Sequence, residues 1–278
     1  MYSLRFSKTY GFGIMEKNKL QQVIEDRYYA DDKIFCVADG VTRDYKDGTP
    51  LEYPQNIEDA KKIMKKYPNP SGAAKAAEIC VADLVKCLKN KRVQKNFKYA
   101  IRLANEDIKK INAGRKINYI AEDDYCCVAV GGLIENDQLF CFSIGDSGIK
   151  VLDDDCNIIF DSEAYLKDDA DLLTRLMDKV FTWIDNCYRK YIRKHLRNNV
   201  WLKNIGKCNI GVLDGSEEAV EFLITYQVSL KNAKYILAYS DGCSESLNTK
   251  EKLKEVIKNP EKIKETIPEK TLIVYEKR

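Results

Sequence analysis

The sequence is poor in histidine, with a single one among 278 residues. His195 lies in the basic stretch Arg189–Arg197, which is typical of a solvated helix surface. The ten cysteines contain no C-x-x-C pair. With one histidine and no paired thiols, a Cys/His zinc site is not expected, and mechanisms that need a histidine cluster are excluded.

The chain also lacks a long apolar run and a strong excess of either charge. No stretch approaches the length of a transmembrane helix, and the first residues lack the apolar core of a signal peptide. The net charge is only +3, with both signs interspersed, so neither a nucleic-acid nor a membrane partner is expected. Several cysteines lie inside apolar runs and are predicted to be small buried hydrophobes in a reducing compartment; they are Cys36, Cys80, Cys126, Cys127 and Cys141. We therefore expect a cytoplasmic monomer.

Apolar periodicity predicts an α+β fold in a single domain that spans residues 1–278. Antiparallel hairpins outnumber βαβ units, so the simplest packing is a four-layer sandwich of two antiparallel sheets flanked by helices. The predicted strands are Ser3–Tyr10, Arg27–Ala30, Ile34–Ala38, Tyr125–Ile134, Gln138–Ile144, Ile149–Asp153, Asn157–Phe160, Asn209–Leu213, Glu221–Leu230, Tyr235–Ser240 and Leu272–Glu276. The predicted helices are Ile57–Lys65, Ser71–Asn90, Val93–Ala113, Asp168–Arg197 and Lys250–Lys258.

Acidic residues stand where four of the predicted strands begin or end. Asp39-Gly40 and Asp241-Gly242 each follow an apolar run, Asp146 follows a hairpin strand, and Glu25-Asp26 precedes a strand. An Asp-Gly pair on its own is also a common turn dipeptide. Carboxylates brought together repel one another unless cations neutralise them, and a site without histidine or thiolate suits Mg²⁺ or Mn²⁺.

The stretch Gly145-Asp146-Ser147-Gly148 has a second interpretation, because the same four residues surround the nucleophile of trypsin-like serine proteases. Those enzymes need a histidine base that precedes the serine in the chain. The only histidine here follows Ser147 and lies in a basic stretch. The protease interpretation therefore fails.

Taken in order, the acidic motifs resemble those of the metal-dependent protein serine/threonine phosphatases, the PPM family or type 2C. The resemblance rests on Glu25-Asp26, Val37-Ala38-Asp39-Gly40-Val41, Leu103-Ala104-Asn105-Glu106-Asp107-Ile108, Ile144-Gly145-Asp146-Ser147, Ala238-Tyr239-Ser240-Asp241-Gly242 and Thr271-Leu272-Ile273-Val274, and it covers essentially the whole chain.

The resemblance implies a binuclear Mn²⁺ or Mg²⁺ centre at one edge of a two-sheet sandwich. Asp39 would bridge the two ions, the Gly40 carbonyl would bind one and Asp241 the other. Glu25, beside Asp26, would act through water on the metal, and Asp146 would bind a third, looser ion. A metal-bridging hydroxide would attack phosphorus in line, so no residue serves as a covalent nucleophile.

The sequence departs from the family pattern at two positions. Pro268 stands where the family usually has an aspartate ligand, and Glu269, one residue later, either reaches the metal in its place or leaves that ligand missing. Gln21 stands where the family has a phosphate-binding arginine. Lys17, Lys19 and Arg43 are the candidates to supply that positive charge, without the bidentate geometry of arginine.

Two functions therefore stay open at this point. The first is a phosphatase that hydrolyses phosphoserine or phosphothreonine on a phosphorylated protein. The second is a phosphatase-like pseudoenzyme that binds a phosphoprotein or another partner without hydrolysing it. The retained Asp39, Gly40 and Asp241 favour activity, and Pro268 and Gln21 favour the pseudoenzyme.

Overall fold

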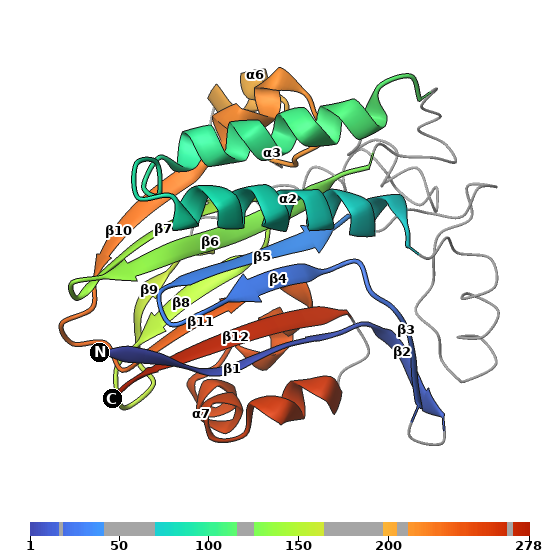
Figure 1. Ribbon diagram of the computed structural model, residues 1–278. Helices are drawn as coiled ribbons and strands as arrows, with labels where there is room; N and C mark the ends of the chain where they lie inside the picture. Colours follow the sequence, from blue (N-terminus) through green and yellow to red (C-terminus); the bar gives the residue numbers. More distant parts are fainter. Residues whose placement is uncertain (17–18, 42–69, 116–124, 164–196, 205–210, 266–268) are drawn as a thin grey trace.

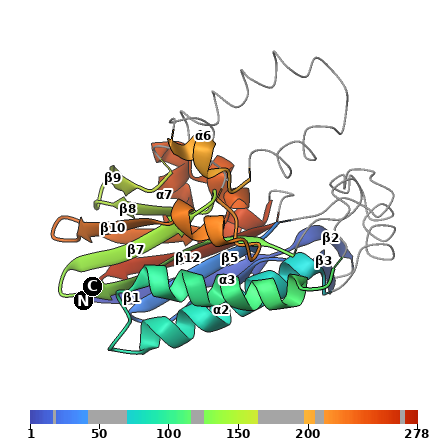
Figure 2. The same ribbon diagram turned by 90° about the horizontal axis from the view of Figure 1, so that it is seen from above.

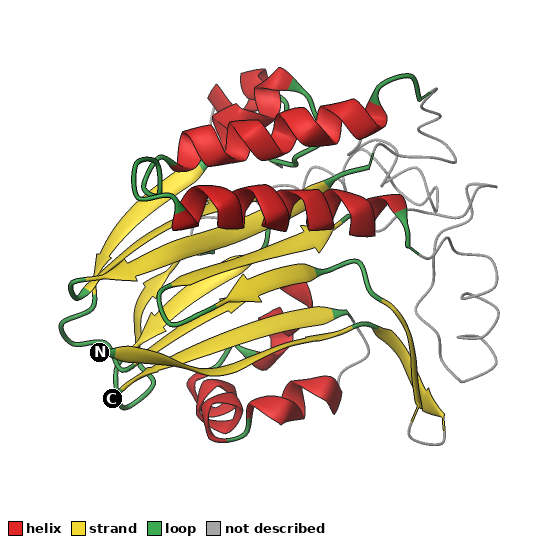
Figure 3. Ribbon diagram, in the orientation of Figure 1, coloured by secondary structure: helices red, strands yellow, loops and turns green. Residues whose placement is uncertain are grey.

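The computed structural model describes residues 1–16, 19–41, 70–115, 125–163, 197–204, 211–265 and 269–278 (Figure 1). Within these residues, two five-stranded antiparallel sheets lie between helices (Figure 3). The first sheet has the order β1 (Tyr2–Tyr10), β12 (Lys270–Lys277), β11 (Tyr235–Tyr239), β8 (Gly148–Leu152) and β9 (Ile158–Asp161). The second has the order β10 (Ile224–Ser229), β7 (Gln138–Ile144), β6 (Cys127–Glu135), β5 (Ile34–Gly40) and β4 (Arg27–Ala30).

Strand β5 shows how the sequence produces the layers. Successive side chains of the strand point to opposite faces of the sheet. Cys36 and Ala38 pack toward α2 (Gly72–Lys89) and α3 (Phe97–Asn112), which lie side by side in both views (Figure 1 and Figure 2). Phe35 and Val37 pack between the two sheets. A further apolar cluster joins the outer face of the first sheet to α7 (Lys250–Lys258). The predicted four-layer α+β sandwich is confirmed.

Most predicted elements are present with small shifts at their ends. Helix α2 begins after Ser71, as predicted, and Ser71 Oγ accepts a hydrogen bond from the Ala74 amide at 3.0 Å. Helix α3 begins at Phe97 rather than Val93, because hydrogen-bonded turns occupy residues 90–96 and the Asn96 side chain caps the helix.

Two predicted strands need correction. The first two residues of the predicted strand Glu221–Leu230 belong instead to a 3₁₀ helix, η2 (Glu217–Phe222), which packs Ala219, Val220 and Phe222 against the apolar cluster of α2 and α3. In the predicted strand Asn209–Leu213, only Leu213 pairs, in an isolated bridge with Cys127, and residues 205–210 lie outside the described part.

The structure also contains elements that the sequence reading missed. They are the hairpin β2 (Phe12–Glu16) and β3 (Lys19–Val23), a short helix α6 (Val200–Asn204), and the 3₁₀ helices η3 (Asp241–Ser246) and η4 (Pro260–Glu265). The predicted helices Ile57–Lys65 and, up to residue 196, Asp168–Arg197 lie outside the described residues.

The five cysteines predicted to be buried are all buried and unpaired, which confirms their role as small apolar side chains. None of the described helices combines the length and the apolar character needed to cross a bilayer.

Candidate functional site

The predicted acidic residues meet at one end of the sandwich, at the right in Figure 1. In the second sheet, Arg27 of β4 pairs with Ala38 of β5, so Glu25-Asp26 and Asp39 lie at the same edge. In the first sheet, Tyr239 pairs with both Leu272 and Gly148. Just beyond these pairs lie Asp241, after the end of β11, and Glu269 and Asp146, before the beginnings of β12 and β8. The three residues therefore lie at one edge of the first sheet.

Asp39 occupies the centre of the carboxylate group. The carboxyls of Asp26 and Asp241 lie near it, and of all neighbouring charges these two raise the pKa of Asp39 most. Asp26 precedes β4 of one sheet and Asp241 follows β11 of the other. Asp39 therefore joins the acidic residues of the two sheets, which is the place that a bridging ligand would have to occupy.

Asp26 lies at the bottom of the site and is 2% exposed. Its Oδ2 accepts hydrogen bonds from Ser240 Oγ and Thr271 Oγ1, both at 2.7 Å. Ser240 Oγ in turn accepts from the Thr271 amide at 2.8 Å, and Thr271 Oγ1 hydrogen-bonds to Thr9 Oγ1 at 2.6 Å. This network fixes the Asp26 carboxylate between β11 and β12.

Glu25 and Glu269 link the site to helix α2 and to the start of β12. Glu25 is fully buried, and Ser71 Oγ donates a hydrogen bond to its Oε1. Glu269 Oε1 accepts from the backbone amides of Glu25 and Asp26, at 2.6 and 2.8 Å. Glu269, which the sequence offered as a replacement for the ligand missing at Pro268, thus lies inside the carboxylate group.

Both glycines of the Asp-Gly pairs are required by close backbone contacts. A Cβ on Gly40 would lie 2.8 Å from the carbonyl carbon of Ala73 and 2.9 Å from the Glu25 carbonyl oxygen. A Cβ on Gly242 would lie 1.8 Å from the Glu269 carbonyl oxygen. The glycines therefore let the segments that carry Asp39, Glu25, Asp241 and Glu269 approach one another.

The crowding of carboxyl groups raises their pKa values. Burial, and then the charges of Asp26, Asp241, Asp146 and Glu269, hold the pKa of Asp39 well above its usual range. Burial raises the pKa of Asp26 to about 6, against the hydrogen bonds that it accepts. Loss of surrounding water, with the charge of Asp241, raises the pKa of Asp146 to about 7. The raised pKa values mean that the negative charges of these carboxylates are not neutralised by nearby positive groups. A cation bound among them would supply that positive charge.

The donor set fits a hard divalent cation by its chemistry, because it consists of carboxylate oxygens with the Gly40 carbonyl at the same strand end. Although protein surrounds these carboxyls, part of each of Asp39, Asp146 and Asp241 reaches the surface, so ions have access from solvent. As the side chains stand, no group of three or more His, Cys, Asp or Glu in the described residues is arranged to hold a metal ion. The ligand assignments therefore stay predictions.

The side chains of the phosphate-binding candidates lie outside the described residues. Lys19 and Gln21 belong to β3, where Gln21 pairs with Ile14, but their side chains are outside the described part. Lys17, Arg43 and Pro268 lie in undescribed segments.

Sequence reasoning missed four residues that support the carboxylates. Ser240 and Thr271 hold Asp26, Ser71 holds Glu25, and Glu163 lies near Asp146 and Asp241, since its charge contributes to raising the pKa of both. Ser240 carried a signal, because it is a polar residue that ends an apolar run directly before Asp241. Glu163 carried none, since it follows a short strand without a motif.

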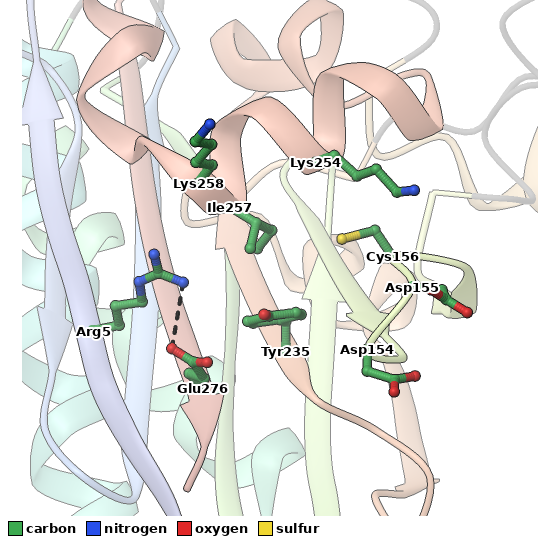
Figure 4. A pocket seen from close by; sticks show the side chains of 9 residues that line it. All are labelled: Arg5, Asp154, Asp155, Cys156, Tyr235, Lys254, Ile257, Lys258 and Glu276. Atoms are coloured by element: carbon green, nitrogen blue, oxygen red, sulfur yellow. Dashed lines mark hydrogen bonds and ion pairs between the residues drawn. The ribbon is translucent and has the colours of Figure 1, made fainter.

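A separate groove of about 490 Å³ lies between α7, the β8–β9 turn and the outer face of the first sheet (Figure 4). It shares no residue with the carboxylate group. Its lining residues are Arg5, Asp154, Asp155, Cys156, Tyr235, Lys254, Ile257, Lys258 and Glu276.

Comparisons of sequence identify no relative of this chain. No protein-family model matches it, and no curated protein matches it.

Solved structures share its fold over nearly the full length. The Mycobacterium tuberculosis serine/threonine phosphatase PstP has a TM-score of 0.54 at 15% identity, covering 99% of this chain and 97% of its own. PppA of Pseudomonas aeruginosa, a key regulatory component of T6SS, has a TM-score of 0.57 at 13% identity, with 99% and 97% covered. The serine/threonine phosphatase Stp1 from Staphylococcus aureus has a TM-score of 0.55 at 11% identity, with 100% and 94% covered. The predicted resemblance to PPM-type phosphatases is confirmed at the level of the fold.

Proposed function

We propose that this protein is a metal-dependent phosphatase that hydrolyses phosphoserine and phosphothreonine on proteins. The observation that carries the proposal is the position of Asp39, which lies at the strand end where Asp26 of one sheet and Asp241 of the other also lie. Support comes from the fold shared with serine/threonine phosphatases, and from a structure of the PstP catalytic domain in complex with two manganese ions.

In this proposal Asp39, the Gly40 carbonyl and Asp241 would hold two Mn²⁺ or Mg²⁺ ions, with Glu269 in the place of the ligand missing at Pro268. Asp146 would serve a third, weaker ion. The ions, when bound, would activate water at neutral pH and neutralise charge on the phosphoryl group.

The chain's own residues position these carboxylates. Ser240 and Thr271 hold Asp26 by its Oδ2. Ser71, at the start of α2, holds Glu25. Glu269 is fixed by two backbone amides, which both donate to its Oε1.

The test is hydrolysis of p-nitrophenyl phosphate and of a phosphothreonine peptide, measured with Mn²⁺ and with EDTA. We expect Mn²⁺-dependent turnover of both substrates that is lost in Asp39→Ala, the variant without the central carboxyl. A rate in Mn²⁺ no higher than that of Asp39→Ala would remove the enzyme proposal.

That outcome would favour the pseudoenzyme. A phosphothreonine peptide that binds without turnover, measured by fluorescence anisotropy, would then identify a phosphoprotein-binding module.

A further inference from the structure

A buried lysine lies beside the carboxylate group. Lys150 of β8 is 5% exposed, and its Nζ contacts Asp161 Oδ2 at 2.7 Å and Glu163 Oε2 at 3.3 Å. The side chains of both carboxylates are less than one-fifth exposed. A buried cation with two carboxylates is fully paired, and one negative charge remains in excess.

Glu163 is the member of this trio that contacts the segment carrying Asp241. The Tyr239 hydroxyl donates to Glu163 Oε2, and Ser244 Oγ donates to Glu163 Oε1 at 3.4 Å. Tyr239 ends the strand before Asp241, and Ser244 belongs to η3, which begins at Asp241. Glu163 therefore holds the chain on both sides of Asp241.

The same contacts reach the turn that carries Asp146. Tyr239 is fully buried and packs against Gly148, where a Cβ would lie 2.3 Å from the tyrosine ring. The Tyr239 hydroxyl is thus directed past the start of β8 to Glu163. Consistent with this placement, the charge of Glu163 contributes to raising the pKa of Asp146 and of Asp241.

We propose that Glu163 is a positioning residue of the carboxylate group: it holds the segment that carries Asp241, and its charge favours a cation on the Asp146–Asp241 side. This inference rests on the proposed function.

The test is the Mn²⁺ affinity of the full-length protein by isothermal titration calorimetry, for wild type, Glu163→Gln and Asp161→Asn. Each variant removes one of the two carboxylates on Lys150 and leaves the other, so Lys150 stays paired in both. The asparagine also keeps an acceptor oxygen for the Glu163 amide, which donates to Asp161 Oδ1 at 3.0 Å. We expect Glu163→Gln to weaken Mn²⁺ binding about five- to tenfold, and Asp161→Asn to change it less than about twofold.

Thermal unfolding in EDTA separates positioning from general destabilisation. We expect the melting temperatures of the two variants to agree with each other. If Glu163→Gln melts lower, Glu163→Asp decides, because it keeps the charge: an affinity near that of wild type supports the proposal, and a loss equal to that of Glu163→Gln contradicts it.

Mn²⁺ binding by the wild-type protein separates the role of Glu163 from the proposed function. Wild-type protein that binds no Mn²⁺ would overturn both. Wild-type protein that binds Mn²⁺ with the same affinity as Glu163→Gln would overturn the role of Glu163 alone.

Discussion

Gly242 is the residue whose identity the site restricts most tightly by contact. The Glu269 carbonyl oxygen lies 1.8 Å from the place that a Cβ would take. This oxygen belongs to backbone and cannot rotate away as a flexible side chain would. The Asp-Gly pair, which in sequence is only a common turn dipeptide, is here a contact between the two segments that carry Asp241 and Glu269.

Gly242→Ala should therefore separate Asp241 from Glu269. We expect a loss of about 2–3 kcal/mol in the free energy of unfolding, from forced overpacking, together with weaker Mn²⁺ binding. Urea denaturation in EDTA and calorimetric Mn²⁺ titration measure the two effects.

The matched control is Gly114→Ala. Gly114 has a φ of +80° and nothing within 4 Å of its Cβ position, so alanine there costs only about 1–2 kcal/mol for the left-handed backbone and leaves Mn²⁺ binding unchanged. A Gly242→Ala variant that binds Mn²⁺ like wild type would show that the contact does not place the carboxylates.

Helix α2 is connected to the site through its N-cap residue, Ser71. Ser71 both caps the helix, by accepting from the Ala74 amide, and donates to Glu25. The sequence was sufficient to predict the cap, because serine after proline at the start of an Ala-rich face is a strong local signal. It was not sufficient to predict the bond to Glu25, since that contact depends on tertiary packing.

Ser71→Ala should lower the free energy of unfolding by about 1 kcal/mol through loss of the cap, and should also weaken Mn²⁺ binding because Glu25 is released. Asn96→Ala is its control, since the Asn96 side chain caps α3 in the same way by accepting from the Tyr99 amide. Denaturation and Mn²⁺ titration of both variants should show similar destabilisation but a change in Mn²⁺ affinity only for Ser71→Ala. Equal Mn²⁺ affinities would mean that Ser71 has only a structural role.

In the other elements, too, the sequence predicts structure that local residues determine but not structure that depends on tertiary packing. The hairpin of β6 and β7 was predicted because two apolar runs flank Glu135-Asn136-Asp137, and Asn136 and Asp137 do adopt the positive φ angles of a tight turn. The last two residues of the 3₁₀ helix η2, Glu221 and Phe222, were assigned to the strand that follows, because periodicity alone does not classify a short apolar run.

Across the whole molecule, the site joins segments from both ends of the chain. Glu25-Asp26 and Asp39 come from the first 40 residues and Asp241, Glu269 and Thr271 from the last 40, and β1 pairs with β12. Sequence order could identify the acidic strand ends but not their contacts, because the central position of Asp39 exists only once the two sheets have packed.

This crowding makes the stability of the metal-free protein depend on pH. The pKa of Asp26, about 6 in the folded state, is raised above the value of 3.8 for a free side chain. The folded state therefore binds this proton more tightly than the unfolded chain does. The resulting stability is fully present below about pH 4 and is lost as the pH rises through 6.

We expect wild type to lose roughly 2–3 kcal/mol relative to Asp26→Asn between pH 4 and pH 7 in EDTA, because asparagine cannot ionise. Asparagine keeps an acceptor oxygen for Ser240 and Thr271. Urea denaturation of both proteins at several pH values measures the difference, and a difference that does not change with pH would contradict the burial of an ionisable Asp26.

The most direct test of the central claim is anomalous diffraction from crystals soaked in Mn²⁺, recorded for wild type and for Asp39→Asn. We expect two manganese peaks on either side of the Asp39 carboxylate in wild type, and the loss of at least one of them in Asp39→Asn. Wild-type crystals that show no manganese at Asp39 under saturating Mn²⁺ would contradict it.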